Sequence, residues 1–340
     1  MKKFILPIPF ILVFILFSCS SSKKTTETIV IDDGYTSIFP NRETSDELEL
    51  ISRSLVLINN LTFYSNYLFL DSTVTRKDIQ VDGPENAVMM STINKTSSGT
   101  GTIIGINGST VSLLTAAHIV SYPDTIITYY YNENGKVSDY VESVMIKKRQ
   151  NLYSNLPEGG RLKLIASDDK LDIAIVGNTF REINSIRFPK FQFKLGNTDE
   201  LNWGDFVYVF GYPMHNKMVT RGIISLPNTD NPDIFYVDAF INRGSSGGIV
   251  LALRGDAANF ELVGIVSSVP AEKKYVLSPY NHTGELDFLP GTMYNGEMTI
   301  EKFDNIRYGI GKIVSAEAIK NFLHEKESEL VNQGHFLSLD

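Results

Sequence analysis

A long succession of short apolar segments limits the fold of this 340-residue chain more than any other feature. From about residue 86 these segments are rich in Val, Ile, Tyr and Phe, and Gly, Asn, Asp and Pro separate them, which is typical of β-strands. They are AVMMSTI, GTIIGI, TVSLLTA, TIITYYY, LDIAIV, DFVYVFGY, IFYVDAF and FELVGIVS. Asn107-Gly108 and Asn134-Gly135 are hairpin signals. Because only one helix is clear, over residues 315–331, the pattern predicts an all-β protein of antiparallel sandwiches or barrels.

The first twenty residues have a different character and predict an export signal. Lys2 and Lys3 precede an apolar run over residues 4–17. This run is shorter than the roughly 20 residues that a membrane-spanning helix needs. The LFSC sequence that ends at Cys19 resembles a bacterial lipobox, in which the cysteine is lipidated. We therefore expect a lipoprotein signal peptide over residues 1–18, and a protein anchored to a bacterial membrane through Cys19 that faces the periplasm or the cell surface.

Two segments separate the predicted anchor from the β-rich region. Residues 19–45 comprise the lipidated cysteine and a stretch rich in Ser, Thr, Lys and Asp, which is typical of a flexible tether. Residues 46–85 combine helical spacing with a β-rich aromatic stretch, and we expect an N-terminal extension packed on the body of the protein. Cys19 is the only cysteine, so no intramolecular disulfide is expected.

The charge balance argues against nucleic acid as a partner. The chain carries 39 acidic and 31 basic residues, a net charge of −8. Neutralising a phosphate backbone requires a basic face, and the only basic run that stands out is Lys147-Lys148-Arg149.

Three short stretches hold residues that could form a hydrolytic site. His118 in LLTAAHIV follows two small alanines, which let another segment approach its imidazole. Asp172 begins the apolar run DIAIV, and a buried carboxylate must be hydrogen-bonded or paired. NRGSSGGIV, residues 242–250, holds two serines among glycines. Alone, each stretch has an ordinary structural explanation: a core histidine, a surface acid and a flexible loop.

Together the three stretches fit one mechanism. They occur in the order His, Asp, Ser, and enough residues separate them for several strands. A nucleophilic serine needs a histidine base and a carboxylate that holds the histidine tautomer. The glycines allow a tight turn, and that turn must also direct backbone N–H groups toward the oxyanion. At this point either Ser245 or Ser246 could be the nucleophile.

These stretches resemble the chymotrypsin-like serine proteases, most closely their bacterial HtrA-type branch, over about residues 86–325. The segments that carry the resemblance are SSGTGTIIG, TAAHIV, LDIAIV, WGDFVYVFGYP with GIIS, DAFINRGSSGGIV and YGIGKIVSAEAIKNFL. The resemblance implies two six-stranded antiparallel β-barrels, over about residues 86–185 and 186–313. A closing helix over residues 315–331 and a tail over residues 332–340 would follow.

The family pattern around the nucleophile is Gly-Asn/Asp-Ser-Gly-Gly-Pro. Aligned with it, Ser246 takes the nucleophile position, Ser245 stands where relatives carry Asn or Asp, and Ile249 replaces the proline. The resemblance implies His118 as the base and Asp172 as its partner. It also implies an oxyanion hole from the N–H groups of Gly244 and Ser246, with no metal or cofactor.

The resemblance gives a coarser indication of substrate binding. Phe240 occupies the position at the base of the primary specificity pocket, so a preference for Lys or Arg is not expected. The strand residues Gly264, Ile265 and Val266 would line that pocket. The insert over residues 271–307 is longer than the family pattern suggests. The chain ends 29 residues after Gly311, and no PDZ domain is expected there.

The sequence therefore predicts a membrane-anchored serine endopeptidase that acts on polypeptides outside the cytoplasm. Two alternatives remain open. One is a catalytically inactive binding or scaffold lipoprotein on the same fold, because a fold does not guarantee its chemistry. The other is an esterase of the α/β-hydrolase type, because residues 244–248 also fit G-x-S-x-G. The strand-like sequence after the serine, and a histidine that comes first rather than last, disfavour the esterase.

Overall fold

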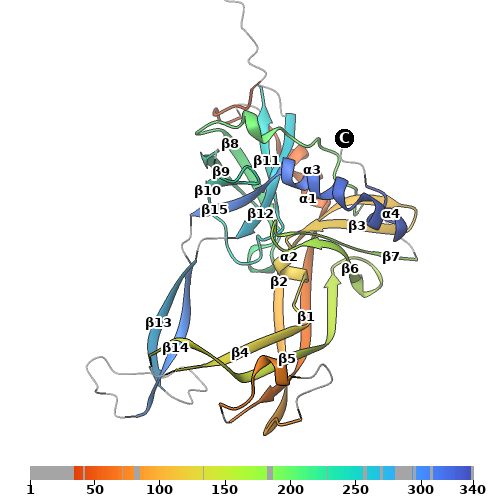
Figure 1. Ribbon diagram of the computed structural model, residues 1–340. Coiled ribbons are helices and arrows are strands. Elements are labelled where there is room, and N and C mark those ends of the chain that lie inside the picture. The colour runs from red at the N-terminus through yellow and green to blue at the C-terminus, as the bar shows by residue number, and fades with distance from the viewer. Residues whose placement is uncertain are drawn as a thin grey trace, which may run out of the picture. The chain divides into compact units, whose positions relative to one another are not determined.

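Six antiparallel strands close the first barrel in the order β1-β2-β3-β7-β6-β5, and β5 pairs back onto β1 (Figure 1). A further strand, β4, pairs with β5 outside the ring. The strands are β1 (Leu55–Leu68), β2 (Met89–Asn107), β3 (Thr110–Thr115), β4 (Thr125–Tyr131), β5 (Val137–Ser154), β6 (Arg161–Asp168) and β7 (Ile173–Thr179). Alternate residues of β1 and β3, such as Val56, Ile58, Val111 and Leu113, fill the barrel and have no exposed surface.

The second barrel also has six antiparallel strands, in the closed order β10-β15-β12-β11-β8-β9. They are β8 (Phe206–Gly211), β9 (Met218–Leu226), β10 (Ile234–Ala239), β11 (Ile249–Arg254), β12 (Asn259–Ser268) and β15 (Ile310–Ser315). Every residue of β8 is buried, because one face lines the barrel and the other packs in the larger core beneath the C-terminal helices. The predicted pair of six-stranded antiparallel barrels is confirmed.

The structure is a computed structural model that describes residues 34–40, 43–70, 72–79, 85–132, 134–181, 187–227, 229–255, 259–268, 271–279, 293, 296–306 and 309–337. These residues belong to one unit, Asp33–Asp340. The predicted signal peptide, Cys19 and most of the tether lie outside them. In the part of the chain that is described, no helix is both long and apolar enough to span a membrane.

The helices are short and lie outside the barrels. They are α1 (Ser45–Arg53), α2 (Ala117–Val120), α3 (Ala316–Glu325) and α4 (Glu327–Asn332), with 3-10 turns at Arg76–Asp78, Glu158–Gly160, Thr198–Glu200 and Pro213–His215. The predicted closing helix is divided at Lys326 into α3 and α4. Ser315 caps α3, because its hydroxyl accepts the N–H of Ala318 at 3.1 Å. Ile319 and Phe322 of α3 are buried against the barrels.

The N-terminal boundary of the first barrel differs from the prediction. The segment over residues 46–85 was expected to be an extension, yet it contributes β1, which pairs with both β2 and β5 and so closes the barrel. Its buried positions alternate, but two of them, Asn60 and Thr62, are polar. The Asn60 amide is satisfied by the carbonyl of Ile119 at 2.9 Å, and Thr62 donates to Asn60 at 3.0 Å. These polar residues hid the apolar alternation of a strand.

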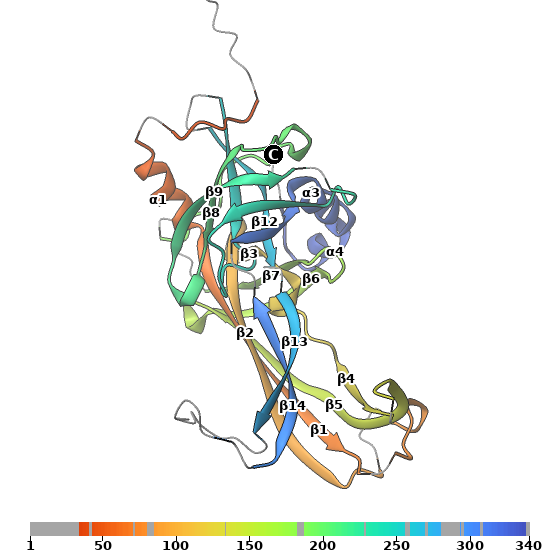
Figure 2. The same cartoon turned by 90° about the vertical axis from the view of Figure 1, so that its left-hand side faces the viewer.

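Two pairs of strands continue beyond the barrels (Figure 2). β2 pairs with β1 from Thr102 as far as Met89, whereas its pairing with β3 covers only Thr102–Asn107. The far part of β1 and β5 has a small core of its own, made of Phe69, Val74, Val141 and Val144. The predicted insert over residues 271–307 contains the ribbon of β13 (Ala271–Pro279) and β14 (Met298–Ile306).

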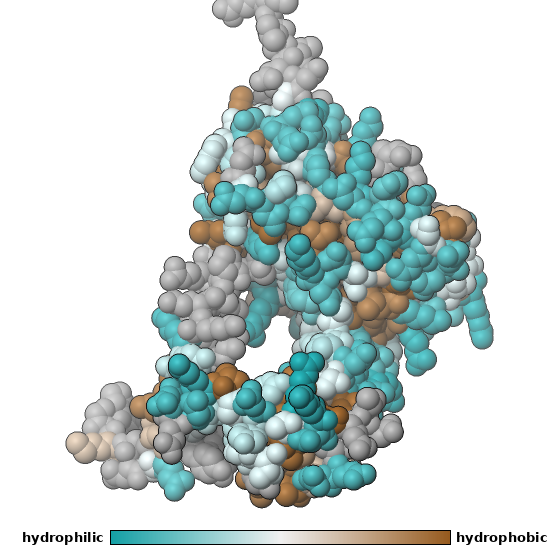
Figure 3. Space-filling model, in the orientation of Figure 1, coloured by the Kyte–Doolittle hydropathy of each residue, from teal (hydrophilic) through white to brown (hydrophobic). Residues whose placement is uncertain are grey.

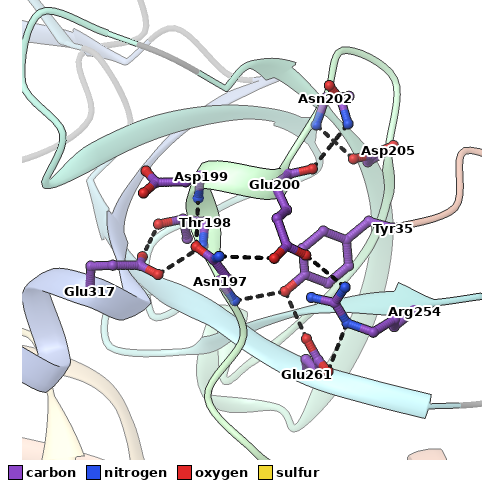
Figure 4. Close-up of polar contacts among 10 residues, drawn as sticks. All are labelled: Tyr35, Asn197, Thr198, Asp199, Glu200, Asn202, Asp205, Arg254, Glu261 and Glu317. Atoms are coloured by element: carbon purple, nitrogen blue, oxygen red, sulfur yellow. Dashed lines mark hydrogen bonds and ion pairs between the residues drawn. The ribbon is translucent and has the colours of Figure 1, made fainter. Parts of the chain in front are cut away.

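A polar cluster attaches the first described residues to the second barrel (Figure 4). Tyr35 donates its hydroxyl hydrogen to Glu261 at 2.8 Å, and Arg254 donates to both Glu261 and Glu200. The Arg254 guanidinium also lies 4.4 Å from the centre of the Tyr35 ring. Burial and the neighbouring Glu261 raise the pKa of Tyr35, so it stays a neutral donor. This cluster fixes the point at which the N-terminal segment meets the barrel.

Candidate active site

His118 stands at the beginning of α2, directly after β3. Its backbone N–H and its Nδ1 atom both face the Asp172 carboxylate. The N–H donates to Oδ1 at 2.9 Å, and Nδ1 lies 2.9 Å from each carboxylate oxygen. Ala116 and Ala117 are almost completely buried beside it, so their small side chains leave room for this approach. The His118 side chain is 47% exposed.

Asp172 lies in the tight turn just before β7. Its φ angle is +63°, a left-handed conformation that Asp tolerates better than most residues. Its side chain is only 16% exposed. Burial opposes ionisation, but hydrogen bonds from His118 and Ser267 outweigh it and hold the pKa of the carboxyl below its ordinary value. An ionised carboxylate only accepts hydrogen bonds, so Nδ1 carries a proton, and in the neutral imidazole this tautomer leaves Nε2 as the acceptor.

The two serines of the glycine-rich turn have different environments. Ser245 is 4% exposed; its N–H donates to the carbonyl of Asn242 at 3.0 Å, and its hydroxyl lies 3.4 Å from the N–H of Asn242. Ser246 is partly exposed and, with His118, lines a surface depression of about 660 Å³. The structure thus brings Ser246, and not Ser245, to the same open space as the imidazole.

Backbone hydrogen bonds hold the turn in place from both sides. The N–H of Gly247 donates to the carbonyl of Val266 at 2.7 Å, and the N–H of Thr100 donates to the carbonyl of Ser246 at 2.8 Å. Gly247 has a φ of +75°, and a Cβ atom there would lie 2.2 Å from the carbonyl oxygen of Thr100. Glycine is therefore required at this position both for its conformation and for its size.

Two N–H groups of the turn are left without acceptors. Within the described residues, the backbone N–H groups of Gly244 and Ser246 donate to no protein atom, although the N–H groups of Ser245, Gly247 and Gly248 all do. Unpaired buried N–H groups are rare in proteins. Placed beside a serine hydroxyl, they are suited to receive an oxyanion. No hydrogen bond joins the Ser246 hydroxyl to His118 in the described part of the chain.

Thr100 holds the glycine-rich turn in place, and the sequence did not single it out. It is completely buried, and its hydroxyl donates to the carbonyl of Gly244 and accepts the N–H of Tyr212, both at 2.9 Å. Its carbonyl accepts the hydroxyl of Thr115. Thr100 belongs to the first barrel, so this barrel fixes the turn of the second. Threonines are common in strands, so the sequence alone does not reveal that Thr100 holds the turn.

Ser267 is the second such residue. Its hydroxyl donates to Oδ2 of Asp172 at 2.6 Å, although Ser267 belongs to β12 of the second barrel and Asp172 to the first. The residue is buried. The only signal in the sequence was a polar residue at the end of the apolar run FELVGIV.

The four residues predicted to bind substrate do not line the surface depression, although Val266 is hydrogen-bonded to Gly247 and Gly248 of the nucleophile turn. Ile265 and Val266 are fully buried in the second barrel, and Gly264 is buried with them. Phe240 is 81% exposed and lines a separate depression with Phe39, Phe206, Arg221, Gly222, Ile223, Asp238, Ala239 and Gly309. None of the four lines the depression that holds His118 and Ser246.

That depression has a polar, partly cationic lining. The other lining residues are Asn59, Asn60, Leu61, Thr96, Ser97, Ser98, Tyr153, His215, Arg243 and Gly244. The His215 backbone has a φ of +62°, and its N–H donates to the carbonyl of Tyr212. Arg243 supplies the carbonyl for the N–H of Met214. Within the described residues, no group of three or more His, Cys, Asp or Glu side chains is arranged to hold a metal ion.

The known proteins that this chain resembles are serine peptidases. Residues 99–265 match the family model of the trypsin-like peptidase domain. Over these residues the chain is therefore similar to trypsin-like peptidases. It is 30% identical over 177 residues to a probable periplasmic serine endoprotease DegP-like of Pseudomonas fulva (strain 12-X), a match that covers 50% of this chain and 29% of that protein. It is 32% identical over 138 residues to the periplasmic pH-dependent serine endoprotease DegQ of Escherichia coli (strain K12), covering 37% and 28% respectively.

The matches thus span less than a third of the length of these relatives. Among solved structures, the crystal structure of the serine endoprotease from Yersinia pestis aligns with 86% of this chain and 69% of its own, at 19% sequence identity and a TM-score of 0.41.

Proposed function

We propose that this trypsin-like domain is an active serine endopeptidase with Ser246 as nucleophile, His118 as general base and Asp172 as the residue that orients it. One observation carries the proposal. Asp172 is buried, is hydrogen-bonded to both His118 and Ser267, and so fixes the tautomer of His118. His118 lines the same depression as Ser246. The serine endoprotease names of the DegP-like and DegQ relatives support the same reaction class.

The reaction would begin when the Ser246 hydroxyl attacks the scissile carbonyl while Nε2 of His118 takes its proton. The negatively charged oxygen of the tetrahedral intermediate would accept hydrogen bonds from the N–H groups of Gly244 and Ser246. His118, stabilised as a cation by Asp172, then gives the proton to the leaving amine. Water repeats the sequence on the acyl-enzyme and releases the second product. Each step uses only groups of this chain and water.

We further propose that the protein works outside the cytoplasm and is attached to a membrane through a lipid on Cys19. The signal-like run over residues 4–17 and the lipobox-like sequence that follows it support export and lipidation. The relatives are named as periplasmic proteins, which supports the same side of the membrane. Several acyl chains on one cysteine would give stable anchoring.

Labelling with a fluorophosphonate probe and cleavage of casein test the catalytic proposal. Ser246→Ala is expected to abolish both, because it removes the nucleophile while the backbone bonds of the turn remain. Ser245→Ala is the matched control and is expected to keep both, because its hydroxyl makes only one long contact. Full labelling of Ser246→Ala would refute the assignment.

A binding or scaffold function on the same fold is the competing candidate. The observation that favours it is the lack of a hydrogen bond between Ser246 and His118 among the described residues. Catalytic hydrogen bonds are often long in the free enzyme and form only with substrate. A wild-type protein that neither takes up the probe nor cleaves unfolded casein would establish the competing candidate.

A further inference from the structure

The strand β2 has an open edge that begins at the candidate active site. On one side, β2 pairs with β1 along its whole length from Met89 to Thr102. On the other side it pairs with β3 only from Thr102 onward, and the N–H of Thr100 is taken by the carbonyl of Ser246. Between Met89 and Gly99, no strand of the described chain pairs with this second edge. The edge therefore becomes free where the nucleophile turn ends.

The hydrogen bonds near the barrel show which residues of β2 face outward. Ile103 donates its N–H to Ser54 on the β1 side, whereas Thr100 donates to Ser246 on the opposite side. Residues of an antiparallel strand alternate in the side to which their N–H and C=O groups point, and the pairing of β1 with β2 has no bulge. The outward-facing residues after Thr100 are Ser98, Thr96, Asn94, Thr92 and Met90. At about 3.4 Å per residue they span roughly 27 Å.

This edge lacks the usual protection against pairing. Natural proteins blunt exposed edges with charges, prolines, bulges or a covering segment, because an open edge recruits other strands. The sequence of this edge, MMSTINKTSS, has one charged residue, Lys95, and no proline. Thr96 and Asn94 are exposed, as are Met89 and Met90 at the far end. Figure 3 shows a largely hydrophilic surface over the barrels in the orientation of Figure 1.

The edge is continuous with the depression that holds the catalytic candidates. Thr96, Ser97 and Ser98 line that depression together with His118 and Ser246. In the proposed reaction His118 protonates the leaving amine, so the C-terminal half of the substrate departs on the His118 side. The C-terminal half of the substrate, read from its N-terminal to its C-terminal end, runs away from the nucleophile turn. Strand β2, read from Met89 to Gly99, runs toward that turn. The two chains are therefore antiparallel.

We propose that the substrate segment C-terminal to the scissile bond binds as an added antiparallel strand on the free edge of β2, from Ser98 to Met90. This inference rests on the proposed function, since it needs a substrate carbonyl at Ser246. Main-chain hydrogen bonds supply the affinity in such strand addition. The protease thereby selects extended polypeptide with about eight residues beyond the cleaved bond, whatever their sequence. Unfolded proteins meet this requirement, and short peptides do not.

A series of peptides of increasing length tests the proposal. A casein sequence that the full-length protein cleaves is made with a fixed N-terminal half and with two, four, six or eight residues after the scissile bond. Each added pair of residues is expected to raise kcat/KM about 3- to 10-fold, because two backbone hydrogen bonds form per pair. N-methylation along the longest peptide is expected to lower kcat/KM at every second residue only. A gain that stops at two residues, or a methylation effect without this period, overturns the proposal.

Proline substitutions on the protein give a second, independent readout. Asn94→Pro removes an outward N–H but no bond to β1, which an edge strand tolerates. It is expected to abolish the gain from the last four residues of the long peptide, and to do so at least three times more strongly than Asn94→Ala. Thr125→Pro is the matched control on the other open edge, β4, where the bond from Lys147 to Asp124 shows that Thr125 faces away from β5. It is expected to change nothing.

The two proposals fail in different ways. A protein that takes up no fluorophosphonate probe and cleaves no peptide of any length contradicts the proposed function, and the strand-addition proposal fails with it. A protein that is labelled at Ser246 and cleaves the two-residue peptide as well as the eight-residue one keeps the function and loses only the open-edge inference. If Asn94→Pro lowers the melting temperature strongly, the N-methyl series on the wild type still decides.

Discussion

The two halves of the candidate active site are held by different kinds of bonds. In the acid–base half, His118, Asp172 and Ser267 are joined directly through their side chains, with distances of 2.6–2.9 Å. In the nucleophile half, backbone hydrogen bonds and the Thr100 hydroxyl hold the turn, whereas the side chain of Ser246 makes no hydrogen bond within the described residues. The first half depends on the chemistry of particular side chains. The second depends on backbone shape, and above all on the glycines that permit it.

This difference predicts different consequences of substitution. A change of one atom in the acid–base half should impair the reaction while leaving the fold intact, since the barrel cores do not involve it. A change near the nucleophile turn should impair reaction and stability together, because the same bonds join the turn to the first barrel. Three substitutions separate the effect on activity from the effect on stability, and each prediction has an outcome that would contradict it.

The largest expected effect is that of Asp172→Asn. An amide nitrogen facing Nδ1 would donate rather than accept and would favour the wrong imidazole tautomer, so we expect kcat/KM to fall about 10⁴-fold. The melting temperature should change far less than the activity does. Steady-state cleavage of a casein peptide and thermal unfolding measure the two. A loss below tenfold would show that the side-chain network does not control the base.

A smaller loss of activity, with a larger loss of stability, is expected for Thr100→Val. The substitution keeps the shape of the side chain but leaves the buried N–H of Tyr212 and the carbonyl of Gly244 without their partner. Leaving two such groups unsatisfied costs about 2–4 kcal/mol in the free energy of unfolding. Displacement of the turn should lower kcat/KM by up to about 10²-fold. If Thr100→Val unfolds in urea like the wild type, the Thr100 hydroxyl does not stabilise the turn.

The smallest effect, about tenfold in kcat/KM, is expected for Ser267→Ala, which removes one charge-assisted hydrogen bond. It also changes the pH dependence. Because the pKa of Asp172 is below its ordinary value in the folded protein, its stabilising contribution is present above the unfolded pKa and is lost as the pH falls through the folded one. Loss of the Ser267 hydroxyl raises the folded pKa, so the decline on the acid side should begin at a higher pH.

Unfolding free energies and kcat/KM measured from pH 7 to pH 3 test this shift. Ser52→Ala is a suitable control, because its hydroxyl bonds a carbonyl of its own helix, far along the chain from the site. If stability and kcat/KM of Ser267→Ala decline at the same acidic pH as in the wild type, the hydrogen bond to Asp172 contributes no net free energy.

The apolar runs and the turn residues between them predicted an antiparallel all-β protein, and the family resemblance implied the two six-stranded barrels. The sequence pattern placed the β-rich stretch of residues 46–85 outside the barrel, because the buried positions Asn60 and Thr62 of β1 are polar and the amide nitrogen of Asn60 is satisfied only by Ile119, a partner distant in the sequence. It also predicted one closing helix where Lys326 divides two. Local patterns do not report contacts of this kind, since the satisfying partner is known only once the chain has folded.

The candidate site was predicted in the same uneven way. His118, Asp172 and the two serines became candidates because small residues, a carboxylate in an apolar run and glycines mark them, and the family resemblance selected Ser246. Thr100 and Ser267 carry no such mark, although they hold the site together. Phe240 and the strand residues Gly264 to Val266 were chosen by position in a family pattern, and the structure places them outside the depression. Backbone edges such as that of β2 leave almost no trace in sequence, because any residue can present an N–H group.

The crossing of Thr100 and Ser267 between the barrels has a consequence for the life of the newly made chain. The Thr100 hydroxyl of the first barrel holds the turn of the second, and the Ser267 hydroxyl of the second barrel holds Asp172 beside the first. In the proposed reaction, neither barrel could position the catalytic groups by itself. Activity would therefore appear only when both barrels have folded and docked onto each other.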